Sequence, residues 1–386
     1  MENTNHLFSE FSPVSKSDWL AQVEKDLRGK PLSDLQAHLG NLEIDPFPHP
    51  DDFKLPGQNH QPPTPLFQNA VWEICEDVEA KDVLAADRQA LRALEGGAQA
   101  LRFVVNENLG DHRMESLLEG IDLAAVSIHF LEKNKNAQPL HLLTHFHHVA
   151  KARHGKAVGN ITSGSVNWLH EGAVVVPDAV ELVEMAQDKL PNFKVLTINV
   201  REDFSNPNGM VQALANAVAQ AERWISELTD HGISAEAVNR CLQFSVPVGV
   251  NYFVEIAKLR ALRLLWANVL NGWNVEKAEM PPIESHLAPV SQVADPHQNM
   301  IRATTQAMSA VLGGANRLTA LPSDAFKNQP TDFSRRIARN VQHILQLESH
   351  LDWVADPAAG SWYIESLTEK LAGAAWQVFQ RVSIQA

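Results

Sequence analysis

The chain has 386 residues, of which 45% are hydrophobic and 20% charged, a balance typical of a folded globular protein and unlike that of a disordered chain. Its formal net charge of −14 argues against nucleic acid or an anionic membrane surface as the main partner. Two cysteines are too few for a disulfide framework, and no secretory or membrane-spanning pattern is visible, so we expect a cytoplasmic location.

The first 65 residues are predicted to form an N-terminal arm. Trp19, Val23 and Leu27 share one face of a predicted helix that has Asp18 near its start and Gly29 beyond its end. This predicted helix is amphipathic, and Gly29 and Pro31 end it.

A proline-rich segment follows this helix. Six prolines between Pro46 and Pro63 fix φ and remove backbone donors, so no regular element is expected there. The segment is either a plain linker or an extended arm that wraps a neighbouring subunit. In the second case Phe47, Phe53 and Phe67 would be its apolar anchors.

From about residue 80, helical stretches alternate with short β-branched runs. Gly96-Gly97 and Gly313-Gly314 each separate a helix from a following strand, so both pairs are predicted helix C-caps and not phosphate loops. Six runs are clear strands, and one or two more are expected near residues 285–292 and 351–355. The six are residues 100–105, 123–130, 156–162, 193–200, 242–250 and 316–321. This α/β alternation predicts a (β/α)8 TIM barrel over residues 66–386, with a doubly wound open sheet as the second possibility.

Chemistry in such a barrel lies at the carboxyl ends of the strands. The polar side chains expected there, and so the candidate substrate-binding residues, are Asn106, Arg201, Glu202, Asn251 and Thr319. They do not form a matched set of acid, base and nucleophile, so no catalytic residue is assigned.

A histidine cluster lies on one predicted helix. His141 and His145 are spaced i,i+4, which suits a shared metal, and His147 and His148 follow. The HExxH zinc motif would need glutamate where Leu142 stands, and no third ligand is suggested nearby. We therefore interpret the segment as the polar face of an outer barrel helix and assign no metal site.

The basic residues Lys258, Arg260 and Arg263 lie on another predicted helix. The rest of that helix is apolar and includes Ile256 and Trp266. We expect the three cations to form a solvated or inter-subunit face.

Four segments resemble the methylmalonyl-CoA mutase family. Residues 330–380 (PTDFSRRIARNVQHILQLESHLDWVADPAAGSWYIESLTEKLAGAAWQVFQ) look like the end of its barrel, and residues 251–270 (NYFVEIAKLRALRLLWANVL) and 302–318 (RATTQAMSAVLGGANRL) resemble two further blocks. Residues 8–32 (FSEFSPVSKSDWLAQVEKDLRGKPL) are similar to the N-terminal arm of the small subunits of two-subunit mutases. The matches are in order and span nearly the whole chain.

The resemblance implies a radical rearrangement between methylmalonyl-CoA and succinyl-CoA, with adenosylcobalamin supplying the radical. In the family's catalytic subunits the barrel threads the CoA ester through its centre. A separate C-terminal domain binds the corrinoid through a histidine.

The chain departs from the family's site motifs. Asn199-Val200-Arg201-Glu202 stands where a segment with the active-site histidine is expected, and Cys241-Leu242-Gln243 lacks the arginine of the family's Arg-Leu-Ser block. A Leu-His-Thr-Asn segment becomes Leu318-Thr319-Ala320-Leu321, and no tyrosine occurs in residues 60–100, where the radical-shielding one is expected.

The cobalamin-binding motif also lacks a match. Asp295-Pro296-His297 has the DxH spacing of a cobalamin-ligand loop, but Met300 stands where that loop needs glycine, so we interpret the segment as a helix N-terminus. No such domain follows to Ala386, and we expect no cobalamin on this chain.

These departures favour a non-catalytic small subunit that stabilises a large catalytic mutase subunit in a heterodimer, with adenosylcobalamin bound by that partner. The alternative is an acyl-CoA-binding mutase barrel that works with a separate cobalamin-binding protein through a changed site of Arg201, Glu202 and Asn251. A stand-alone scaffold or regulatory protein with neither partner is a third possibility.

Overall fold

A computed structural model describes residues 12, 14–53, 66–133, 138–153, 157–163, 176–206, 208–275, 279–326 and 330–385. Its main feature is a parallel sheet of nine strand segments in the order β7-β6-β5-β4-β3-β11-β10-β9-β8. The segments are β3 (Glu73–Glu79), β4 (Ala100–Val105), β5 (Ser127–Glu132), β6 (Gly159–Ser163), β7 (Phe193–Lys194), β8 (Leu196–Asn199), β9 (Leu242–Val248), β10 (Ile283–Leu287) and β11 (Arg317–Thr319).

The sheet closes into a barrel at β7 and β8. These two segments are separated by the single residue Val195; β7 pairs with β6, and β8 pairs with β9. The Thr197 hydroxyl on β8 also donates to the Ile161 carbonyl on β6, at 2.7 Å. The nine segments are therefore eight strands in a ring, and the predicted (β/α)8 barrel is confirmed.

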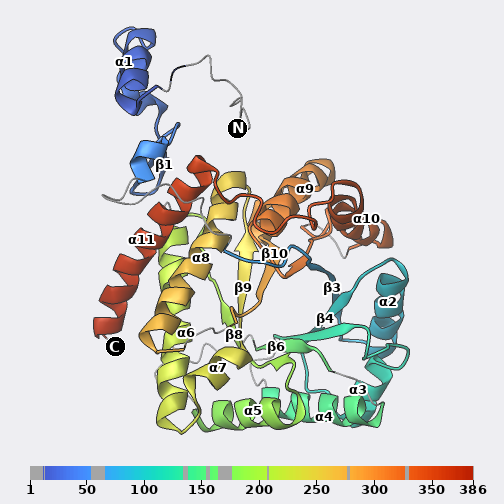
Figure 1. Cartoon of the computed structure of the whole chain (residues 1–386). Helices are drawn as coiled ribbons and strands as arrows, with labels where there is room; N and C mark the ends of the chain where they lie inside the picture. The colour runs from blue at the N-terminus through green and yellow to red at the C-terminus, as the bar shows by residue number, and fades with distance from the viewer. Residues whose placement is uncertain are drawn as a thin grey trace, which may run out of the picture.

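Helices cover the outside of this ring (Figure 1). They are α2 (Val83–Glu95), α3 (Asp111–Leu117), α4 (Pro139–Ala152), α5 (Val176–Lys189), α6 (Gly209–Asp230), α7 (Ala235–Cys241), α8 (Tyr252–Gly272), α9 (Pro296–Leu312), α10 (Asp332–His343) and α11 (Trp362–Gln385). A three-residue 3-10 helix (Pro289–Ser291) precedes α9, and a π-helical turn (Ile344–Glu348) continues α10. The last helix, α11, runs beside α8 and α6 (Figure 1). Within the described residues, no helix has the length and apolarity needed to cross a membrane.

The N-terminal arm begins with α1 (Lys16–Asp26), which Figure 1 shows away from the barrel. Ser15 and Asp18 form a capping box at its start, so the predicted helix is confirmed. After a 3-10 turn (Leu32–Leu35) comes a hairpin that the sequence did not indicate, β1 (Ala37–Leu39) with β2 (Leu42–Ile44). The hairpin is attached to the barrel, because Lys370 of α11 donates to the Glu43 carbonyl at 2.7 Å.

Two expectations for the proline-rich segment need correction. Pro50–Phe53 forms a 3-10 helix, although no regular element was expected there. Phe67 is 8% exposed, and its ring lies 5.1 Å from the Arg263 guanidinium carbon, so it packs against the chain's own barrel. Phe47 is exposed and contacts Trp19, whereas the Phe53 side chain and residues 54–65 lie outside the described residues.

The barrel wall is apolar outside and polar inside. On the outer face Phe130 contacts Phe146 of α4, and Phe244 contacts Trp266 of α8, with ring centroids 5.3 and 5.5 Å apart. TIM barrels usually fill their interior with Val, Ile and Leu. Here every strand of the ring supplies a polar residue to the inner face: Asp77, Arg102, His129, Asn160, Thr197, Gln243, Glu284 and Arg317.

The boundaries of the elements test the remaining predictions. Gly96 and Gly313 are the C-caps of α2 and α9, and Asp295 is the N-cap of α9, all as predicted. The strand expected near residues 285–292 is β10, but residues 351–355 form turns and bends, not a strand. The missing eighth strand is β3, which precedes α2, the first helix of the barrel.

Candidate functional site

All five candidate residues lie at the same end of the barrel. Asn106 follows β4, Arg201 and Glu202 follow β8, Asn251 follows β9, and Thr319 ends β11. Asn106, Arg201 and Asn251 are exposed. In the described part of the chain no hydrogen bond or ion pair joins any two of the five, so they do not form one assembled site.

Glu202 belongs to a buried ion-pair cluster. Its carboxylate accepts from Lys258 Nζ at 2.7 Å, and Glu255 and the Pro247 carbonyl lie 2.6 and 2.7 Å from the same nitrogen. Burial alone would lower the pKa of Lys258, but the Glu255 and Glu202 carboxylates outweigh it and raise that pKa. The Glu202 carboxylate is therefore already bound to a cation of α8.

The expectation that Lys258, Arg260 and Arg263 are solvated is wrong. Lys258 and Arg260 are 0% exposed and Arg263 is 6% exposed. Arg260 pairs with Asp356 and, at 2.7 Å, with Glu365, while Arg263 donates to the Gly314 carbonyl. These cations tie α8 to neighbouring segments. The prediction failed because each cation also binds a group that is distant in sequence: Glu202, Asp356 or the Gly314 carbonyl.

Thr319 lines a cavity of about 550 Å³ at the barrel mouth. Asp77, Lys133, Phe326 and Arg335 also line the cavity, so its wall contains both acidic and basic side chains. Thr319 Oγ1 is buried and has no hydrogen-bond partner among the described residues. Among the five candidate residues, all of which the structure describes, Thr319 is the one that both lines this cavity and has a buried polar atom without a hydrogen-bond partner.

The barrel interior is crossed by a charged network that the sequence reading missed. Arg102 on β4 binds Asp77 at 2.7 Å and also pairs with Glu284 on β10. Arg317 on β11 pairs with the same Glu284 and donates to Asn160 Oδ1 on β6 at 2.8 Å. Because β11 and β6 are not neighbours in the ring, the last bond crosses the barrel.

Electrostatics hold this network in one charge state. Burial alone would raise the pKa of Glu284, but Arg102 and Arg317 outweigh it and hold that pKa well below its usual range. Burial, with Arg102 adding to it, lowers the pKa of His286 to about 4. Near neutral pH the interior therefore contains a charged Arg-Glu-Arg group beside a neutral histidine.

The signal for this network was present in the sequence. Glu284 and His286 alternate along one short run, as do Arg317 and Thr319 along another. Alternating polar residues inside a strand of a parallel barrel mark its inner face. Which of them would meet across the barrel depends on strand order, which periodicity does not supply.

Comparison with known proteins identifies the family. The family model described as methylmalonyl-CoA mutase matches residues 110–385, more than half of the chain. The small subunit of methylmalonyl-CoA mutase from Porphyromonas gingivalis is 32% identical over 395 residues, which cover 97% of this chain and 64% of that protein. The Streptomyces virginiae small subunit is 30% identical, with 81% of this chain and 51% of that protein covered.

A further relative and a solved structure were also found to be similar to the chain. Methylmalonyl-CoA mutase from Rhizobium meliloti is 28% identical over 95% of this chain and 57% of its own length, so the chain spans less than two thirds of these relatives. Among solved structures, dihydropteroate synthase from Xanthomonas albilineans is 15% identical with a TM-score of 0.38, covering 72% of this chain and 93% of that one. The family model and the Porphyromonas gingivalis relative agree, and the chain belongs to the methylmalonyl-CoA mutase family.

Proposed function

We propose that this chain is a non-catalytic small subunit of an adenosylcobalamin-dependent methylmalonyl-CoA mutase and stabilises the large catalytic subunit in a cytoplasmic heterodimer. The observation that carries the proposal is the Arg102–Glu284–Arg317 network across the barrel. A CoA ester that passed along the axis would have to separate these buried charges. Breaking a buried ion pair typically costs about 3–5 kcal/mol.

The barrel mouth does not fit mutase chemistry either. Glu202 lies in the segment where the family resemblance places the active-site histidine, and its carboxylate is bound to the buried Lys258. A carboxylate repels the developing charge on a thioester carbonyl oxygen instead of donating a hydrogen bond to it. The residues present thus do not suit a bound adenosylcobalamin and its substrate, and the proposal assigns the corrinoid to the partner.

An exposed apolar segment after α10 is the surface we assign to the large subunit. Ile344, Leu347, Trp353 and Val354 are 47%, 69%, 73% and 60% exposed. His350 stacks on Trp353 with ring centroids 4.1 Å apart, which holds the indole in place. Exposed tryptophans in apolar patches are frequent binding hot spots.

Co-expression with a large mutase subunit tests the proposal. We expect a heterodimer that converts methylmalonyl-CoA with added adenosylcobalamin, and no turnover by the isolated chain. Turnover by the isolated chain would overturn the non-catalytic assignment.

Trp353→Ser tests the assigned surface within the same experiment. Loss of a hot-spot tryptophan should weaken association by about 2 kcal/mol or more, roughly thirtyfold, in analytical ultracentrifugation. Val290→Ser is the matched control, because Val290 is also exposed, at 67%, but lies before α9. Equal association of both variants with the large subunit would place the interface elsewhere.

The alternative is an acyl-CoA-binding barrel that works with a separate cobalamin-binding protein. It is favoured by the cavity of about 550 Å³ and by the unsatisfied Thr319 hydroxyl in its wall. Calorimetry with a panel of acyl-CoA esters distinguishes the two functions. Micromolar binding that Thr319→Val weakens supports the alternative, whereas no detectable heat removes it.

A further inference from the structure

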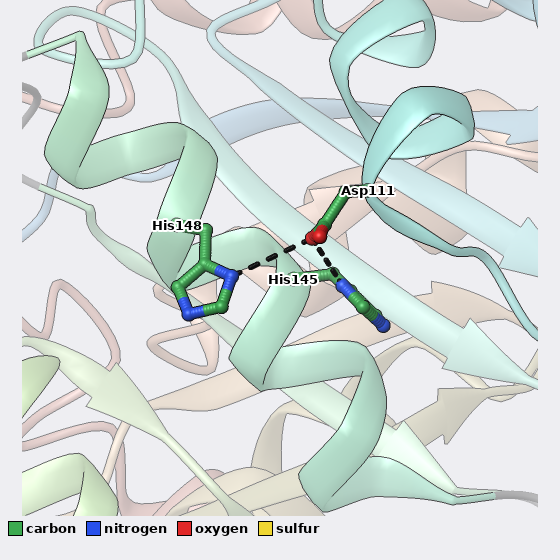
Figure 2. Close-up of side chains that lie close together, drawn as sticks. All are labelled: Asp111, His145 and His148. Atoms are coloured by element: carbon green, nitrogen blue, oxygen red, sulfur yellow. Dashed lines mark hydrogen bonds and ion pairs between the residues drawn. The ribbon is translucent and has the colours of Figure 1, made fainter.

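A second group of ionisable side chains lies on the outside of the barrel, between α3 and α4. The Asp111 carboxylate at the start of α3 contacts His145 Nδ1 and lies 3.5 Å from His148 Nδ1, both on α4 (Figure 2). One ligand atom from each residue can be chosen so that all three lie within 4.8 Å of one another. Figure 2 shows one ring nitrogen of each histidine facing the Asp111 carboxylate.

His141 completes the arrangement from behind. Its Nε2 lies 3.0 Å from His145 Nε2. When His145 donates its Nε2 proton to His141, the His145 Nδ1 lone pair faces Asp111 and His148. A metal-bound histidine is typically oriented in this way, by a hydrogen bond from its other ring nitrogen.

The two helices that carry these residues are fixed to each other. Leu142, Phe146 and Val149 bury the inner face of α4 in the core. Beyond the end of α4, the Arg153 guanidinium donates to the Leu118 carbonyl and, at 3.2 Å, to the Glu115 carbonyl of α3. The donor atoms are thereby held close together before any ligand arrives.

Exposure leaves the group open to an ion. Asp111 and His148 have side chains 53% and 57% exposed, whereas His145 is 15% exposed and forms the fixed floor. Zinc lies about 2.1 Å from nitrogen and oxygen donors, so neighbouring donors of a tetrahedral site lie about 3.4 Å apart. The Asp111–His148 pair, at 3.5 Å, already has this spacing, and a pair at the 4.8 Å limit must close by about 1.4 Å. Rotation of the exposed His148 ring permits this closure.

We propose that Asp111, His145 and His148 bind a divalent transition-metal ion of the zinc class, with His141 as the positioning residue. Two imidazoles and one carboxylate are a donor set that Zn²⁺ accepts, and the solvent side leaves a fourth position for water. The sequence pattern alone provided no third ligand, because Asp111 comes from a different helix. The site lies outside the barrel and is independent of the proposed subunit function.

Zinc titration against a chromophoric chelator tests the proposal on the full chain. We expect one tight site in the wild type, and a dissociation constant at least about tenfold higher in Asp111→Asn and in His148→Ala. His141→Ala should weaken binding by about 10–100-fold through the lost orientation of His145. Circular dichroism confirms that each surface variant is folded.

His112→Ala is the matched control. His112 follows Asp111 on α3 and is fully exposed at 101%, so it offers an imidazole at the same place without a partner imidazole. Its removal should leave zinc affinity unchanged. Zinc binding by Asp111→Asn and His148→Ala as tight as that of the wild type, or no tight site in the wild type, would overturn the proposal.

Discussion

Two groups of ionisable side chains in this protein differ in what they leave available to a ligand. Inside the barrel, the inner group consists of Arg102, Glu284 and Arg317. Both arginines pair with Glu284, so these charges are neutralised within the protein. On the outside, the outer group consists of Asp111, His145 and His148, and the side chains of Asp111 and His148 are more than half exposed. The buried charges on the barrel axis are therefore paired within the protein, whereas the outer pair of helices leaves ionisable side chains exposed to a ligand.

The largest expected effect comes from breaking the inner group. Glu284→Gln leaves Arg102 and Arg317 buried without their shared carboxylate, and this should lower the free energy of unfolding by about 3–5 kcal/mol. Urea denaturation at pH 7 measures it. Glu79→Gln is the control, because Glu79 is half exposed at the end of β3 and should cost no more than about 0.5 kcal/mol. Similar losses in both variants would show that the network does not stabilise the barrel.

The residue types of the strands explain which of them could be recognised from the sequence. Residues 100–105 and 242–250 were recognised because their outer faces are apolar and their runs are β-branched or aromatic. The strand β3 (Glu73–Glu79) was missed because four of its seven residues are acidic. Two of those acids are paired with arginines that are distant in sequence. Arg102 binds Asp77, and Arg335 and Arg339 bind Glu76.

The candidate site was predictable in position but not in role. The predicted carboxyl ends of the strands placed all five residues, including Glu202 and Thr319, at the end of the barrel where the structure has them. That Glu202 is paired with a fully buried lysine depends on how α8 packs against the end of β8. Helix periodicity places Lys258 on a face of α8, but it does not say what covers that face.

A moderate effect is expected from pH. Burial lowers the pKa of His286 to about 4, against an ordinary value of 6.5. Between these values the unfolded chain binds a proton that the folded chain does not, so stability falls as pH falls. From pH 7 to pH 5 the loss due to His286 is about 2 kcal/mol.

The comparison of wild type with His286→Gln isolates this effect. Glu132 acts in the opposite direction, because burial raises its pKa to about 7 and its folded form gains a proton first as pH falls. Groups such as Glu132 contribute equally to both proteins, so the difference in urea stability between pH 7 and pH 5 reports His286. His112→Gln, which replaces a fully exposed histidine, is the control and should lose as much stability between pH 7 and pH 5 as the wild type. If His286→Gln loses as much as these two proteins, His286 is not held neutral in the folded chain.

The smallest expected effect tests whether the hydrogen bonds between α4 and α3 hold the ligands of the outer group in place. Arg153→Met removes the donors that join α4 to the carbonyls of Leu118 and Glu115, which should cost about 1 kcal/mol in urea unfolding. Zinc affinity should fall severalfold with it, because Asp111 and His145 are then less firmly held together. Lys151→Met, in the last turn of the same helix, should change neither quantity. Unchanged zinc affinity in Arg153→Met would show that α4 alone positions the ligands, and the outer group would then be independent of the barrel packing that fixes the inner one.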